Sequence, residues 1–225
     1  MPTSRSLAAP GEIRAYLIDE LNLAVRRPGA FGRESELALR MLVDHLLVVE
    51  CQPEGLIEQQ REWQERGAWS STGVAGVFRD LIPERYYEYG IASVYAEFAH
   101  LRGWLKPDRV LVPDEHAHMQ GTVRQWAAED RVWTDVVDAF GAPSVLFGST
   151  NPSYGKTLGY LTENPQEPMV SFHLWNGGNG GAPGAEQTWP PPYEEPLLLA
   201  VRFGRGPFRQ TFTFTPEGRR RLPAE

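Results

Sequence analysis

The stretch at residues 207–216 reads Pro-Phe-Arg-Gln-Thr-Phe-Thr-Phe-Thr-Pro. Its phenylalanines alternate with arginine and threonine, and this period of two predicts a strand with one buried face. The apolar run at 196–203 predicts a neighbouring strand, and residues 204–207, Gly-Arg-Gly-Pro, supply the turn between the two. We therefore expect a hairpin at the C-terminal end of a sheet.

Two further apolar runs extend this sheet toward the N-terminus. Residues 156–162 and 169–175 each have the length of a strand, and the two prolines between them stop either run from continuing. A slip of one residue would turn the buried side chains toward solvent, so we expect the turns at 163–168 and 204–207 to specify the fold. The sheet, with one short helix before it, occupies residues 136–216.

Helical periodicity dominates the chain before this sheet. Apolar residues recur every three or four positions in segments that we predict as helices at 11–25, 35–51, 55–66, 72–81, 84–105, 114–129 and 131–140. The sequence thus predicts an α+β fold, with a helical N-terminal half packed on a C-terminal antiparallel β-meander of about four to five strands. We expect a mainly helical region at 1–135 and a helix-plus-sheet region at 136–225, together forming one domain. The order of helix, Gly141-Ala142-Pro143 and meander resembles small inhibitor-like modules and outer-membrane-assembly modules in outline.

Composition and charge exclude several classes of protein. The net charge of -7 argues against nonspecific nucleic-acid binding, and no apolar stretch is long enough for a signal peptide or a membrane span. A single cysteine, Cys51, excludes an intramolecular disulfide and fits a reducing compartment. We expect a soluble cytoplasmic protein without a cofactor, and its many arginines beside two lysines are typical of a high-GC bacterium.

Six arginines cluster near the C-terminus: Arg202, Arg205, Arg209, Arg219, Arg220 and Arg221. We interpret them first as solvated charges at the rim of the sheet. The second interpretation is a patch that faces an anion.

A phosphate-binding loop is the first candidate site that the sequence offers. Residues 148–157 begin with glycine and end in Gly-Lys-Thr, as such a loop does. The spacing is two residues too long, however, and the residues after Thr157 predict a strand where a phosphate loop must open a helix. We therefore expect a turn here and no nucleotide.

His116 and His118 form the second candidate, a metal site. Two histidines two positions apart on a helix point about 200° away from each other, so they cannot chelate one ion together. His116 falls in line with Met119, Val123 and Trp126, whereas His118 aligns with Thr122 and Gln125. The ligand set is also incomplete, so we expect no metal.

The third candidate is the polar face of the predicted sheet, opposite its aromatic side. If the strands pair in order, this face carries His173 with Ser171, Trp175, Arg202, Thr211 and Thr213. In a functional interpretation, His173 carries a proton and Arg202 clamps an anion. The alternative, which we favour, is an ordinary face covered by solvent or by helices.

Two functions follow from these candidates. The first is a noncatalytic binding protein, such as an immunity or inhibitor-like module, that presents Trp175, Trp189 and Tyr193 on a glycine-proline loop to a protein partner. The second is a small-molecule-binding protein or an enzyme that uses the polar face around His173 and Arg202. We prefer the first function, because aromatic residues on a stiffened loop offer contact area at low entropic cost.

Overall fold

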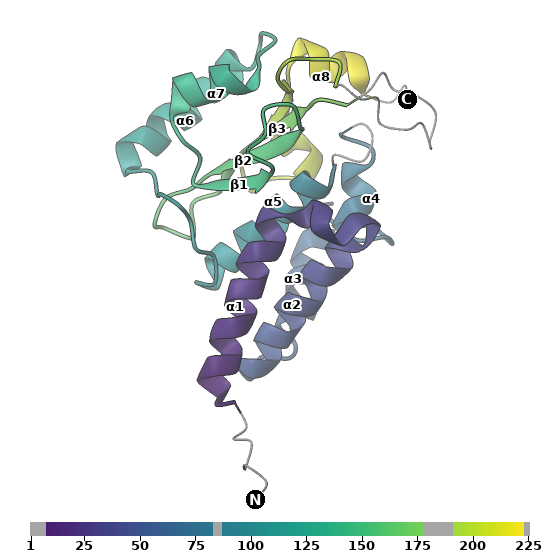
Figure 1. The fold of residues 1–225 in the computed structure, drawn as a ribbon, viewed down its shortest axis with the longest axis vertical. Helices are drawn as coiled ribbons and strands as arrows, with labels where there is room; N and C mark the ends of the chain where they lie inside the picture. Colours follow the sequence, from purple (N-terminus) through teal and green to yellow (C-terminus); the bar gives the residue numbers. More distant parts are fainter. Residues whose placement is uncertain (1–7, 83–86, 178–190, 223–225) are drawn as a thin grey trace, which may run out of the picture.

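The computed structural model describes residues 8–82, 87–177 and 191–222 and has an α+β fold (Figure 1). Its helices are α1 (Pro10–Arg26), α2 (Ser35–Val49), α3 (Gly55–Glu65), α4 (Val74–Phe78), α5 (Tyr87–Leu101), α6 (Pro113–Trp126), α7 (Trp133–Phe140) and α8 (Pro216–Arg221). A 3₁₀ helix, η1 (Pro28–Glu34), joins α1 to α2. Helices α1–α7 pack against a C-terminal sheet of five antiparallel strands, which confirms the predicted fold class.

The sheet is a meander in the order β1-β2-β3-β4-β5. Its strands are β1 (Val145–Gly148), β2 (Lys156–Tyr160), β3 (Val170–Trp175), β4 (Leu197–Arg202) and β5 (Phe212–Phe214). One row of paired residues crosses all five strands: Val145, Gly159, Ser171, Arg202 and Phe212. Because paired residues point to the same face, this row defines the side of the sheet on which Ser171 and Arg202 lie.

The predicted strand at 207–216 is wrong in its first half. Residues Phe208–Thr211 form a 3₁₀ helix, η3, and the strand begins only at Phe212. The backbone N–H of Phe208 donates to the carbonyl of Arg66 at 2.7 Å, and the Thr211 hydroxyl donates to the carbonyl of Phe208 at 2.6 Å. Phe208 and Thr211 are both buried, and a spacing of three suits a 3₁₀ turn rather than a strand.

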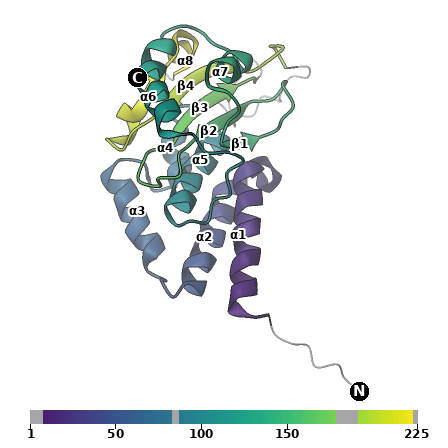
Figure 2. The ribbon, with the colours of Figure 1, turned by 90° about the vertical axis from the view of Figure 1, so that its left-hand side faces the viewer.

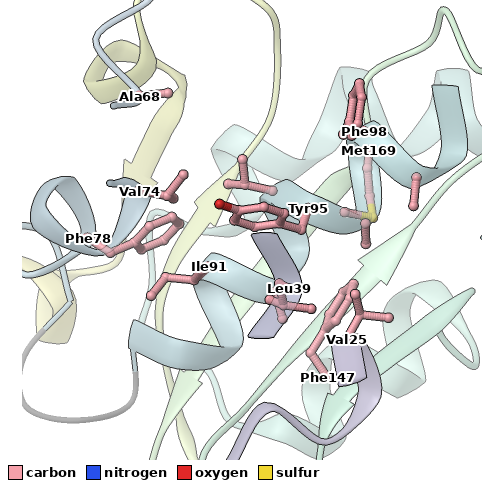
Figure 3. Packing of buried hydrophobic residues seen from close by; sticks show 14 of the residues in the cluster. Val25, Leu39, Ala68, Val74, Phe78, Ile91, Tyr95, Phe98, Phe147 and Met169 are labelled. Atoms are coloured by element: carbon pink, nitrogen blue, oxygen red, sulfur yellow. The ribbon is translucent and has the colours of Figure 1, made fainter. Parts of the chain in front are cut away.

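Helices cover both faces of the sheet (Figures 1 and 2). On one face lies the larger core, built with α1–α5 and containing Phe78, Tyr95 and Phe147 (Figure 3). On the other face, α6 and α7 enclose a second core around Leu158 and Phe172. The sheet is therefore covered on both sides, and every residue of β2 and β3 is buried.

His173 does not lie opposite the aromatic side of the sheet, so that part of the prediction is wrong. Its ring stacks on Phe212, with ring centroids 5.6 Å apart, whereas Phe172 points to the other face. The register explains this, because Arg202 pairs with both Ser171 and Phe212 and so places Phe212 on the same side as the polar residues of β3. Within the described residues, every helix is too short or too polar to span a bilayer.

Candidate functional site

A buried polar layer lies between α5 and the sheet, and Arg202 is its centre. The Arg202 side chain is 1% exposed and its Nη1 pairs with Glu97 Oε2 at 2.8 Å. Its Nη2 donates to the hydroxyls of Ser93 at 3.3 Å and Ser171 at 3.2 Å. The two Nη atoms of Arg202 are thus already held by a carboxylate and two hydroxyls, whereas its buried Nε has no hydrogen-bond partner among the described atoms.

His173 belongs to the same layer. It is 3% exposed, lies against Phe78, and has its Nδ1 3.0 Å from the hydroxyl of Thr157. Burial lowers the pKa of His173 well below its ordinary value of 6.5, and the positive charge of Arg202 lowers it further. The imidazole is therefore neutral near pH 7, and a substrate would reach it only if the helices above it moved.

The structure separates the remaining members of the predicted polar face. Thr211 is buried in η3, where its hydroxyl bonds to the backbone. Thr213 pairs with Val201, and this register places it on the face opposite Arg202. Of the predicted set, the structure therefore brings together Ser171, His173 and Arg202.

A narrow cleft opens beside this buried layer. It has a volume of about 50 Å³ and lies between α3, α5 and the connections β2–β3 and β4–β5. Its lining residues are Gln59, Glu62, Trp63, Arg66, Glu97, Phe98, His100, Leu101, Leu161, Pro165, Glu167, Pro168, Met169, Gly204 and Arg205. Glu97 links the two sites, since it lines the cleft and also pairs with the buried Arg202.

The cleft contains two arginines, Arg66 and Arg205. Neither guanidinium group pairs with a carboxylate among the described residues. Arg66 donates to the carbonyls of Gly204 at 3.3 Å and Gly206 at 3.4 Å, on either side of Arg205. Arg205 itself donates to the carbonyl of Pro165 at 3.2 Å. These are long contacts to neutral acceptors, so both guanidinium groups keep the capacity to bind an anion.

The electrostatic surroundings of Arg66 agree with this geometry. Burial lowers the pKa of Arg66 below its ordinary value, and the charges of Arg202 and Arg205 also lower it. The nearby carboxylates of Glu97 and Glu62 raise it. A ligand carboxylate would relieve the repulsion between Arg66 and Arg205.

Apolar side chains line the cleft beside these arginines. Trp63 and Phe98 meet edge to face, with ring centroids 6.2 Å apart, and Leu101 and Met169 lie near them. The Nε2 atom of His100, another lining residue, is buried and has no hydrogen-bond partner among the described atoms. The cleft thus offers an apolar wall, two cations and an unsatisfied imidazole nitrogen. Its lining also holds three carboxylates, each of which already accepts a hydrogen bond: Glu62 from Gln59, Glu97 from Arg202 and Glu167 from Thr162.

Sequence reasoning missed this cleft because its residues come from four separate segments. One feature of the sequence pointed toward the cleft. This was the cluster of C-terminal arginines, in its second interpretation as a patch that faces an anion. That cluster contains Arg205 but not Arg66, which lies at the end of α3. No local spacing relates these two residues.

The predicted aromatic binding residues lie elsewhere. Trp175 is 1% exposed, and the guanidinium of Arg221 lies 3.8 Å from its ring centroid. Tyr193 is partly buried, its ring centroid is 6.0 Å from that of Trp175, and its hydroxyl accepts from Arg221 at 3.1 Å. Trp189 lies outside the described residues. Trp175 therefore offers no surface to a partner in this structure.

The two histidines of α6 do not come together. His116 is buried, whereas His118 is exposed, so the pair diverges as the helical spacing predicts. His116 Nδ1 lies 3.2 Å from a carboxylate oxygen of Glu167. The described parts of the chain contain no group of three or more His, Cys, Asp or Glu side chains that could hold a metal ion.

Lys156 is a buried cation that the rejected phosphate-loop motif had singled out. It opens strand β2, so the segment starts a strand and not a helix. Lys156 is fully buried, its Nζ donates to the carbonyl of Asn151 at 2.8 Å, and it lies 3.7 Å from the ring centroid of Trp133. Burial lowers its pKa from 10.5 to about 8.

With this geometry established, we compared the chain with known proteins. No model of a protein family, no curated protein and no solved structure matches it.

Proposed function

We propose that this protein is a noncatalytic binding protein that recognises an acidic segment of a partner protein in the cleft between α3 and α5. The observation that carries the proposal is the pair Arg66 and Arg205, two guanidinium groups without a carboxylate partner within the described residues, beside an apolar wall. Guanidinium groups bind carboxylates in a planar, two-pronged geometry. Trp63 and Phe98 are 4% and 5% exposed and form the floor of the cleft, so Leu101, which is 37% exposed, is the apolar residue on which a bound side chain can pack.

The size of the cleft supports a peptide side chain as the occupant. Its volume of about 50 Å³ lies far below the roughly 300–1,000 Å³ of sites that enclose a small molecule. One aspartate or glutamate side chain can enter such a cleft while the rest of the segment lies across its mouth. An immunity or inhibitor-like role is one form that this binding could take.

An array of short peptides tests the proposal. Each peptide that contains aspartate or glutamate is paired with a copy that has asparagine or glutamine instead. We expect the protein to bind a subset of the acidic peptides and to lose these when the amides replace the acids. Equal binding of the two sets would contradict the proposal, because the amides have the same shape but no charge.

Matched arginine variants locate the site. Arg66→Ala combined with Arg205→Ala should remove peptide binding, whereas Arg209→Ala should keep it, because Arg209 is exposed and pairs with Asp80 at 2.8 Å outside the cleft. Thermal unfolding of each variant controls for loss of the fold. Full binding by a folded double variant would exclude this cleft.

The second candidate function is a small-molecule-binding protein or enzyme that uses His173 and Arg202. Glu97 favours it, because this carboxylate connects Arg202 with the cleft. A screen of small carboxylates by thermal shift would detect such a ligand. A stabilisation that Arg202→Lys removes, but that the Arg66 and Arg205 variant retains, would favour this function over peptide binding.

A further inference from the structure

The exposed apolar side chains of this protein gather on one helical hairpin. Ten large hydrophobic residues are exposed in the described part of the chain, and seven of them fall between residues 13 and 48. These seven are Ile13, Tyr16, Leu23, Phe31, Leu37, Met41 and Val48. Single exposed apolar residues are ordinary, but such a concentration marks an interaction surface.

Helix α2 shows the pattern most clearly. Leu37, Met41 and Val48 follow one another at spacings of four and seven, which places them along one face of the helix. The buried residues Leu39 and Val43 occupy the opposite face. Helix α2 is thus apolar on two sides, and the outer side has no partner within the described chain.

Helix α1 continues the same surface. Ile13, Tyr16 and Leu23 are exposed, and α1 packs along α2 as the neighbouring arm of the hairpin (Figures 1 and 2). The 3₁₀ helix η1 joins the two arms at one end, and the ion pair between Arg14 and Glu50, 2.8 Å long, joins them at the other. Both arms of the hairpin therefore carry exposed apolar residues.

We propose that this hairpin surface, defined by the seven residues above, binds a second copy of the chain. Two copies related by a twofold axis would bring four helices together, an arrangement in which two apolar hairpin faces cover each other. The surface is the same on both copies, so it needs no other partner to be complete. This inference is independent of the cleft and of its proposed ligand.

The charges around the surface favour a second copy over a strongly charged partner. The chain carries a net charge of -7, yet several charged residues of this hairpin are neutralised by ion pairs within the same copy. These pairs are Arg14–Glu50, Lys106–Asp19, Arg26–Asp108 and Arg40–Glu36. Glu12, Glu20 and Asp44 of the hairpin have no ion pair among the described residues, and Asp44 shares the face of α2 with Met41 and Val48, so each copy brings a few uncompensated carboxylates to the contact.

The area is also sufficient for self-association. Six of the residues, those of α1 and α2, are between 41% and 63% exposed. With roughly 200 Å² for each fully exposed large side chain, they offer about 600 Å² of apolar surface, close to the ~800 Å² that each partner buries in a standard interface. Polar residues at the rim supply the remainder.

Sedimentation equilibrium of the full chain across a range of concentrations tests the inference. We expect the wild type to have twice the chain mass of 25.3 kDa. Met41→Glu places a charge in the middle of the surface and should raise the dissociation constant by about a hundredfold or more. A wild type that stays at the chain mass at every concentration would overturn the proposal.

Two valines provide a matched control. Val48 lies on the hairpin surface and is 55% exposed, whereas Val112 precedes α6 and is 56% exposed. Val48→Glu should weaken association and Val112→Glu should not, while both variants keep the circular dichroism spectrum of the wild type. Equal effects of the two variants, or a dimer that Met41→Glu leaves intact, would place any self-association on another surface and overturn the inference.

Discussion

Replacing Lys156 by methionine is expected to stabilise the protein at neutral pH. Burial lowers the pKa of this lysine from 10.5 to about 8. Each pKa unit between these values is worth about 1.4 kcal/mol, so the charged amine costs the folded state about 3 kcal/mol. The contact with the Trp133 ring and the hydrogen bond to Asn151 offset up to ~2 kcal/mol of this cost. Lys156→Met should therefore raise the free energy of unfolding by about 1–3 kcal/mol at pH 7.

The pH dependence gives this prediction its sharpest form. Below pH 8 the amine is protonated in both states, and the wild type carries the full cost. Between pH 8 and 10.5 the folded state loses the proton first, so the unfolded state binds more protons and wild-type stability rises with pH. The advantage of Lys156→Met should therefore shrink across this window.

Urea denaturation at pH 7 and at pH 10 measures both effects. The control is Lys106→Met, because Lys106 is the only other lysine in the sequence and lies at the surface, paired with Asp19. Its effect on the free energy of unfolding should be below about 1 kcal/mol. If Lys156→Met destabilises the protein at pH 7, or if the difference between variant and wild type does not change with pH, the assignment of Lys156 as a buried, poorly compensated cation is incorrect.

Three further predictions concern the polar layer and the close packing around the sheet. Arg202→Met leaves the Glu97 carboxylate without its partner and should lower the free energy of unfolding by ~3–5 kcal/mol in urea denaturation. Adding Glu97→Leu should restore much of this loss. No recovery in the double variant would contradict a direct pair. Gly218→Ala would place a Cβ atom 1.9 Å from a backbone carbonyl oxygen of β4, so we expect the free energy of unfolding to fall by about 1–3 kcal/mol in thermal unfolding. Unchanged stability would show that α8 does not dock on β4 as described. Because the pKa of His173 is depressed in the folded state, wild-type stability should fall as the pH drops below 6.5. His173→Phe should remove this contribution to the slope of the free energy of unfolding against pH between pH 5 and 7. The same slope in both proteins would refute the burial of a neutral imidazole.

The meander could be predicted from the sequence because its strands are apolar runs bounded by proline and glycine. The second apolar face of the sheet could not be predicted in the same way. In β3, Ser171 and His173 alternate with apolar residues, and alternation normally indicates one solvated face. Here helix α5 covers this polar row in place of water. Its residues Ser93 and Glu97 accept hydrogen bonds from Arg202, which also donates to Ser171.

The strand at 207–216 fails as a prediction for a related reason. Its alternation is a local signal, but the conformation of Phe208 is set by a distant contact with the carbonyl of Arg66. Phe208 packs against Phe78, with ring centroids 5.6 Å apart, and this anchor draws the chain into η3 before β5 begins. Tertiary packing thus overrides a pattern of period two.

The C-terminal arginines show why a candidate site cannot be identified from residue type alone. In the sequence they form one cluster, but the structure gives them different partners. Arg202 pairs with Glu97, Arg209 with Asp80 and Arg221 with Glu217, and each of these carboxylates lies in a different element or loop. Arg205 has no carboxylate partner in the described chain and instead adjoins Arg66, whose charge is attracted most by Glu97 and is repelled by Arg202 and Arg205. The capacity to bind an anion therefore depends on which carboxylates the fold brings near, and among these five arginines it concentrates on Arg66 and Arg205.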